Sequence, residues 1–123
     1  MLAACGTGAL WWLLRPFRVE VEGPSMEPTL LPGEWAIAIR ARRVRAGDVV
    51  VVAHPHRPEV ELVKRVVAAN GGRLRIAGDN PARSTDSRDF GDVAEANVGR
   101  VVVVYWPPGR IRSIRRRTNR SRP

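Results

Sequence analysis

One residue in this sequence stands out as a possible proton acceptor. Lys64 is the only lysine among the 21 lysine and arginine residues. Arginine does not lose its proton in a protein, whereas lysine can do so once it is desolvated. Lys64 lies in the apolar run LVKRV at 62–66, which predicts a strand with Leu62, Lys64 and Val66 on one face and Arg65 on the other. It is therefore a candidate general base, and the alternative is a lysine that protects an edge strand from aggregation.

Ser25 is the candidate nucleophile. Gly23 and Pro24 precede it and Pro28 follows it, which predicts a rigid turn with an exposed hydroxyl. Taken alone, Ser25 is better explained as an ordinary turn serine. A serine becomes nucleophilic only beside a base, and neither histidine of the sequence lies in a catalytic context. Ser25 and Lys64 together are therefore more informative than either residue alone.

A lysine base must be uncharged when it accepts a proton. An ordinary lysine, with a pKa of about 10.4, is neutral in fewer than about one molecule in a thousand at pH 7. A pKa near 7 would require the charged form to be destabilised by about 4 kcal/mol. We expect burial of the Lys64 amine among Leu62, Val66 and other apolar side chains, completed by bound substrate, to supply this energy.

The remaining reactive side chains indicate neither a metal site nor a second nucleophile. His54 and His56 have no third ligand near them in the sequence, so we predict a loop without metal. Cys5 is the only cysteine, which excludes a disulfide scaffold, and is expected to be a buried or terminal thiol. We therefore expect no cofactor.

The pattern of apolar residues predicts an all-β fold: a small, mostly antiparallel β-domain with short helical turns. Residues 17–22 alternate between apolar and charged, as in a half-buried strand, and VVVVA at 49–53 is typical of a strand buried on both faces. The run NGG at 70–72 predicts the turn of a hairpin. The expected strands are 17–22, 34–40, 49–53, 60–69, 73–77 and 99–106, with a helical turn at 93–97 and specialised loops at 23–33 and 78–92.

Charge and hydropathy divide the chain into an apolar N-terminal segment (1–16), a folded domain (17–109) and an arginine-rich tail (110–123), which is expected to be disordered. The formal net charge is +9, but the tail holds seven arginines, so the domain itself is nearly neutral. That distribution argues against a nucleic-acid-binding domain. A helix over residues 1–14 would span about 21 Å, less than the ~30 Å of a hydrocarbon core. We expect it to contact a membrane surface or to cover the core of the domain.

Three segments resemble the sequence boxes of the type I signal peptidases. The first is GPSMEPTL at 23–30 with PGE at 32–34, the second is KRVV at 64–67, and the third comprises GDN at 78–80, DSR at 86–88 and FG at 90–91. They occur in the family's order over residues 19–106. More narrowly, the sequence is similar to the small proteases of this family that mature nickel-type superoxide dismutase, through HP at 54–55, STDSR at 84–88, YWP at 105–107 and the short spacing between the first two boxes.

The resemblance implies a serine endopeptidase in which Ser25 attacks the scissile carbonyl and Lys64 accepts its proton. It also implies that Ser84 orients the Lys64 amine and that the Ser25 backbone N–H meets the oxyanion. Gly23 occupies the position of a second oxyanion donor, a serine in some relatives, and Met26 belongs to the same box. The implied supporting ion pairs are Arg65 with Asp79 and Asp86 with Arg88.

These implications define the functional expectation. We expect the removal of an N-terminal propeptide from a protein substrate, a nickel-type superoxide dismutase precursor, by a cytoplasmic protein that lies at the membrane periphery. One alternative is a general, membrane-anchored type I signal peptidase that acts on exported preproteins. An alternative of another class is a non-enzymatic basic β-domain that binds nucleic acid, a partner that neither peptidase hypothesis requires.

Overall fold

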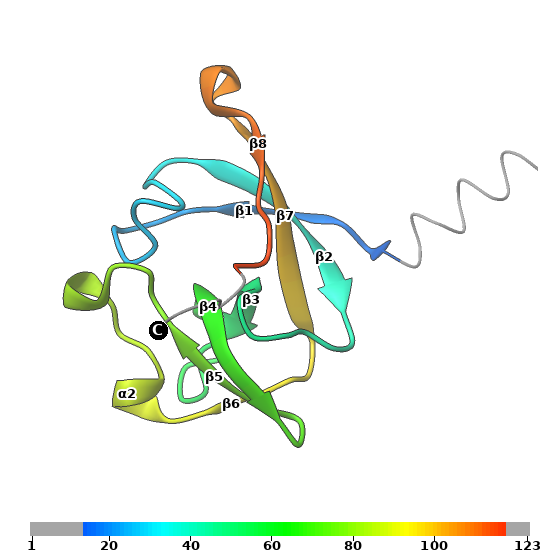
Figure 1. The fold of residues 1–123 in the computed structure, drawn as a ribbon, viewed down its shortest axis with the longest axis vertical. Helices are drawn as coiled ribbons and strands as arrows, with labels where there is room; N and C mark the ends of the chain where they lie inside the picture. Colours follow the sequence, from blue (N-terminus) through cyan, green and yellow to red (C-terminus); the bar gives the residue numbers. More distant parts are fainter. Residues whose placement is uncertain (1–13, 118–123) are drawn as a thin grey trace, which may run out of the picture.

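Short β-branched or alternating segments separated by glycine and proline form one antiparallel sheet in the computed structural model, which describes residues 14–117 (Figure 1). The strand order is β1-β2-β7-β3-β4-β5-β6, with β8 paired to β7. The strands are β1 (Phe17–Glu20), β2 (Trp35–Ala41), β3 (Val49–Ala53), β4 (Glu61–Asn70), β5 (Arg73–Ala77), β6 (Val93–Ala94), β7 (Val98–Trp106) and β8 (Arg112–Ser113). The short helix α2 (Ser87–Phe90) and 3₁₀ turns at Pro81–Arg83 and Pro108–Arg110 complete the described elements.

The core lies on both sides of the central strand β3. Val49 and Val51 belong to one apolar cluster, and Val50 and Val52 belong to a second. Strand side chains alternate between the two faces of a sheet, so a strand with apolar residues at every position must be covered on both. The prediction that 49–53 is buried on both faces is confirmed.

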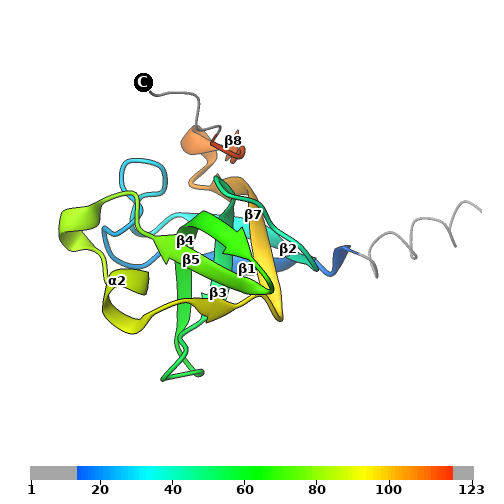
Figure 2. The same ribbon diagram turned by 60° about the horizontal axis from the view of Figure 1, so that its bottom comes forward.

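Two long loops approach each other at one side of the sheet. The first, 21–34, joins β1 to β2, and the second, 78–92, joins β5 to β6 and contains α2. Both views place the second loop beside the β4–β5 hairpin (Figures 1 and 2). The Asn80 N–H donates to the Ser25 carbonyl at 2.8 Å, so the two loops are in direct contact.

The predicted all-β architecture is confirmed, and the predicted strands occur close to their expected bounds. The helical turn predicted at 93–97 is wrong. Val93 and Ala94 instead form β6, in which Val93 pairs with Leu74 and Ala94 with Arg73. Val93 is 4% exposed in the second apolar cluster, and its burial beside β5 outweighs the weak local preference for a turn.

The prediction of a disordered tail is wrong for residues 110–117. Four tail arginines bind buried carboxylates of the domain: Arg110 and Arg112 with Glu34 at 3.2 and 2.7 Å, Arg116 with Asp48 at 2.7 Å and Arg117 with Asp79 at 3.2 Å. A buried carboxylate without a cation is costly. The tail supplies the cation for Glu34 and Asp48 and adds a second one to Asp79, which Arg65 also binds. The arginines therefore hold this part of the tail on the body of the protein.

The remaining terminal residues, 1–13 and 118–123, lie outside the described part of the chain, and with them the predictions for Cys5 and for membrane contact by the apolar segment. Within residues 14–117, no helix has both the length and the hydropathy needed to span a bilayer.

Candidate active site

Ser25 lies in a turn that the apolar core anchors. The Glu27 N–H donates to the Pro24 carbonyl at 3.1 Å, and the Leu30 N–H donates to the Met26 carbonyl at 3.0 Å. Met26 and Leu30 are 1% and 0% exposed, so their burial fixes the turn on both sides of the serine. Ser25 itself is half-buried, and its hydroxyl donates to and accepts from no described side chain.

Asn80 binds the Ser25 turn to the second loop, and the sequence analysis did not identify this role of Asn80. Its N–H donates to the Ser25 carbonyl at 2.8 Å, and its Nδ2 donates to the Pro24 carbonyl at 3.2 Å. Gly78 makes this approach possible, because a Cβ there would lie 2.6 Å from the Ser25 carbonyl oxygen and 2.3 Å from Ser84 Oγ. Gly78 and Asn80 both belong to the GDN run at 78–80, and this run was the sequence signal that could have identified them as site residues.

Lys64 projects from β4 and is 4% exposed. Its Nζ donates to Ser84 Oγ at 2.9 Å, and this hydroxyl donates to Asp86 Oδ2 at 3.1 Å. Burial lowers the pKa of the Lys64 amine, against the opposing charges of Asp86 and Asp89. The hydrogen bond between Lys64 and Ser84 that the resemblance implied is thus present, and the Ser84 hydroxyl lies between the amine and Asp86 in this chain of hydrogen bonds.

Asp86 organises the loop that carries Ser84. Its carboxylate is 0% exposed and binds Arg88 Nε at 3.0 Å and the Gly78 N–H at 3.2 Å. It also accepts the Arg88 N–H, while Asp89 accepts the Asp86 N–H, a reciprocal cap of α2. Burial raises the pKa of Asp86, but the bonds from Arg88, Gly78 and Ser84 outweigh it and lower the pKa overall. The carboxylate therefore stays ionised and holds the Ser84 hydroxyl in place.

Arg65 points away from Lys64, as strand alternation requires. It binds Asp79 in a bidentate pair, with Nη2–Oδ2 at 2.6 Å and Nε–Oδ1 at 3.1 Å, and donates to the Gly47 carbonyl at 2.8 Å. Thr29, from the Ser25 loop, donates to the same carboxylate. The pair therefore joins β4 to both loops. Arg65 is 7% exposed and holds these segments together, whereas its neighbour Lys64 lines the groove.

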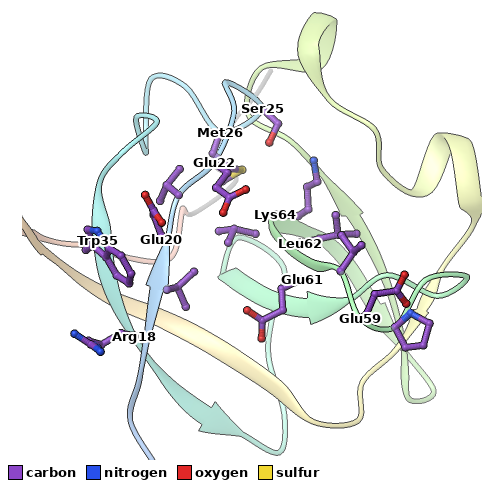
Figure 3. Close-up of a pocket in the computed structure, with 15 residues that line it drawn as sticks. Arg18, Glu20, Glu22, Ser25, Met26, Trp35, Glu59, Glu61, Leu62 and Lys64 are labelled. Carbon is purple, nitrogen blue, oxygen red and sulfur yellow. The ribbon is translucent and has the colours of Figure 1, made fainter.

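Ser25, Met26 and Lys64 line one groove of about 740 Å³. Lys64 extends toward Ser25 inside it (Figure 3). The groove continues along β1 on one side and along the start of β4 on the other. Gly23 is absent from its lining and has φ +76°, so this position offers the groove no side-chain donor.

Of the predicted site residues, the structure therefore brings together the candidate nucleophile, the candidate base and their support from Ser84, Asp86 and Arg88. His54 packs against the Phe90 ring at 4.8 Å. Within residues 14–117, no group of three or more acidic, histidine or cysteine side chains could hold a metal ion. The arrangement places the Ser25 hydroxyl and the buried Lys64 amine in the same groove.

Residues 1–77 match the family described as "Signal peptidase, peptidase S26". Mitochondrial inner membrane protease subunit 2 of Danio rerio is 34% identical over 119 residues, which cover 73% of this chain and 64% of that protein. Mitochondrial ATP-independent inner membrane protease subunit 1a of Arabidopsis thaliana is 34% identical over 123 residues, covering 77% of this chain and 73% of the relative. The chain thus spans about two thirds of the length of these curated relatives. Its sequence places it in the signal peptidase family, peptidase S26.

Proposed function

We propose that this chain is a peptidase that cleaves protein substrates through a dyad of Ser25 and Lys64. The Ser25 hydroxyl attacks the scissile carbonyl carbon, and its proton passes to the neutral Lys64 amine, which gives a tetrahedral oxyanion. Collapse breaks the peptide bond, the leaving amine takes the proton from Lys64, and an acyl group stays on Ser25. Lys64 then deprotonates the water that hydrolyses this ester.

The observation that carries the proposal is a buried lysine that shares a groove with a serine and has no carboxylate partner. Among the described residues, the Lys64 amine donates only to the neutral hydroxyl of Ser84. A lysine needed only for structure would pair with an acid or extend into solvent. Burial of Lys64 lowers its pKa instead and so favours the neutral amine that a general base requires.

The surroundings of Ser25 support the same chemistry. Its backbone N–H donates to no described residue and is therefore available to the oxyanion. The groove also runs beside β1, an edge strand. Val21 uses its N–H and carbonyl on the β2 side, both at 2.8 Å, so the backbone groups of Glu20 and Glu22 face the open edge, where an extended peptide can pair.

For the substrate, we retain the prediction of an N-terminal propeptide, with a nickel-type superoxide dismutase precursor as the specific candidate from the sequence resemblance. The relatives are named as mitochondrial inner membrane proteases, which supports protein processing at a membrane as the wider class and keeps preprotein cleavage as the alternative. Nucleic-acid binding is disfavoured, because carboxylates already neutralise Arg112, Arg116 and Arg117.

Cleavage by the purified full chain tests the proposal. A dismutase precursor and a signal-peptide-bearing preprotein are incubated in parallel, and mass spectrometry identifies each new N-terminus. We expect Ser25→Ala and Lys64→Arg to lower turnover by at least about 10³-fold, and Ser113→Ala, at an exposed serine on β8, to leave it unchanged. Cleavage of the same bond by Ser25→Ala at the wild-type rate would refute the dyad.

A further inference from the structure

The acidic residues of this chain fall into two groups: those that have a hydrogen-bond or ion-pair partner among the described residues and those that have none. All twelve lie in the described part of the chain. Seven accept a hydrogen bond or ion pair from a described residue: Glu34, Asp48, Asp79, Asp86, Asp89, Asp92 and Glu95. Four of the five others, Glu20, Glu22, Glu59 and Glu61, line the groove that holds Ser25 and Lys64.

These four glutamates form the two walls of the groove. Strand alternation buries Val19 and Val21 and turns Glu20 and Glu22 outward on one wall. Glu59 and Glu61, before and at the start of β4, lie on the other (Figure 3). Glu22 lies nearest to Ser25 of the four in this view. At about 3.3 Å per residue, the wall from Arg18 to Glu22 spans about 13 Å, the length of four extended peptide residues.

The basic residues of the groove do not neutralise these carboxylates. Arg18 lies over the Trp35 ring, 5.7 Å from its centroid, and the Lys64 amine is bound to Ser84. Even with both counted as charged, the groove has a formal charge of −2 in a chain whose net charge is +9. The arginines that neutralise other carboxylates lie outside the groove lining, so the groove presents an excess of unpaired negative charge.

We propose that the groove selects peptide substrates with lysine or arginine side chains in the segment adjacent to the scissile bond. The inference rests on the proposed function, since it takes the groove to be the substrate site. A cationic side chain seated between the walls gains attraction to Glu22 on one side and Glu61 on the other. An acidic segment is repelled by both walls, so the same residues discriminate against it.

Two peptides of equal length, identical except for lysine or glutamine beside the same scissile bond, test the selection. We expect the wild-type chain to prefer the lysine peptide by about tenfold in kcat/KM at low salt, from two partly exposed pairs at about two- to fivefold each. The preference for the lysine peptide should shrink in 0.5 M NaCl, because the Debye length falls to about 4 Å and the salt screens these pairs. The double variant Glu22→Gln, Glu61→Gln should lose it, whereas Asp92→Asn, which removes one charge outside the groove, should keep it.

The outcomes separate the two proposals. If wild type cleaves both peptides equally and the glutamine variants change nothing, the charge selection is wrong and the peptidase stands. If wild type cleaves neither, the proposed function fails, and binding of the two labelled peptides to Ser25→Ala, followed by fluorescence anisotropy, decides the selection. Tighter binding of the lysine peptide supports it, and equal binding overturns it.

Discussion

Substitution of Gly78 by alanine is the most direct test of whether the two loops must meet for the site to work. An added Cβ would lie 2.6 Å from the Ser25 carbonyl oxygen and 2.3 Å from Ser84 Oγ, against an ordinary contact distance of at least 3.4 Å. Both neighbours would have to give way. The Ser25 turn would have to withdraw by about 0.8 Å, and the Ser84 backbone would have to shift as well, because the Ser84 Cβ would also lie 2.6 Å away and side-chain rotation does not move it.

Each displacement disturbs a contact that supports the proposed dyad. Withdrawal of the turn lengthens the 2.8 Å bond from Asn80 to the Ser25 carbonyl toward or beyond hydrogen-bond range. Displacement of Ser84 disturbs the 2.9 Å bond that holds the Lys64 amine. A displacement of about 1 Å between catalytic groups costs about 10²-fold in rate, and overpacking costs about 1–3 kcal/mol in the free energy of unfolding. We therefore expect Gly78→Ala to fold and to lose about 10²-fold in kcat/KM.

The assay measures peptide cleavage and thermal unfolding side by side. Gly109→Ala is the matched control, because a Cβ there meets nothing within 4 Å and the residue has no left-handed backbone. We expect the control to retain the cleavage activity and the thermal unfolding midpoint of the wild type. Wild-type cleavage and stability in Gly78→Ala would refute the inferred coupling between the loops.

Two further predictions concern stability. Because burial lowers the pKa of Lys64 in the folded state, the unfolded chain binds more protons than the folded chain between that pKa and 10.5, and wild-type stability rises with pH in this window. Lys64→Met should therefore have a larger free energy of unfolding than wild type near neutral pH, and the difference should narrow toward pH 10.5 in denaturant titrations. A difference that does not change with pH would contradict the lowered pKa of Lys64. Arg112→Gln removes the 2.7 Å partner of Glu34 and should lower the free energy of unfolding by about 2–3 kcal/mol, because a buried carboxylate loses its main cation and keeps only Arg110 at 3.2 Å. The bond from Arg112 also lowers the pKa of Glu34, so this difference should be present above pH 4.5 and disappear as pH falls through the folded pKa, and an unchanged melting curve at pH 7 would refute it.

Local pattern was sufficient for most of the sheet and for the residue types of the site. The alternation at 17–20 has the period of a half-buried strand, and the short β-branched run at 49–53 favours a strand by residue type. β1 and β3 therefore follow from neighbouring residues alone. The apolar neighbours of Lys64 likewise predicted its burial, because they belong to the same strand.

Pattern failed where a segment is too short to have a period or where its partner is distant. The two residues of β6 form a strand because β5 offers them an edge, and Val93 fills the core beside it. The tail looked solvated because its arginines have no acids near them in sequence. Their partners lie far away, as with Arg112 and Glu34, which are 78 positions apart.

The sequence by itself determined which chemistry is available: one lysine able to lose its proton, one serine on a rigid turn, and an apolar strand to bury the amine. Only the tertiary structure decided which groups meet, because a hydrogen bond such as that from Asn80 to Ser25 joins residues more than fifty positions apart and needs their two loops to be held against each other. The acidic groove has the same origin. Glu22 and Glu61 become opposite walls of one site only when the curved sheet brings the edge of β1 across from the start of β4.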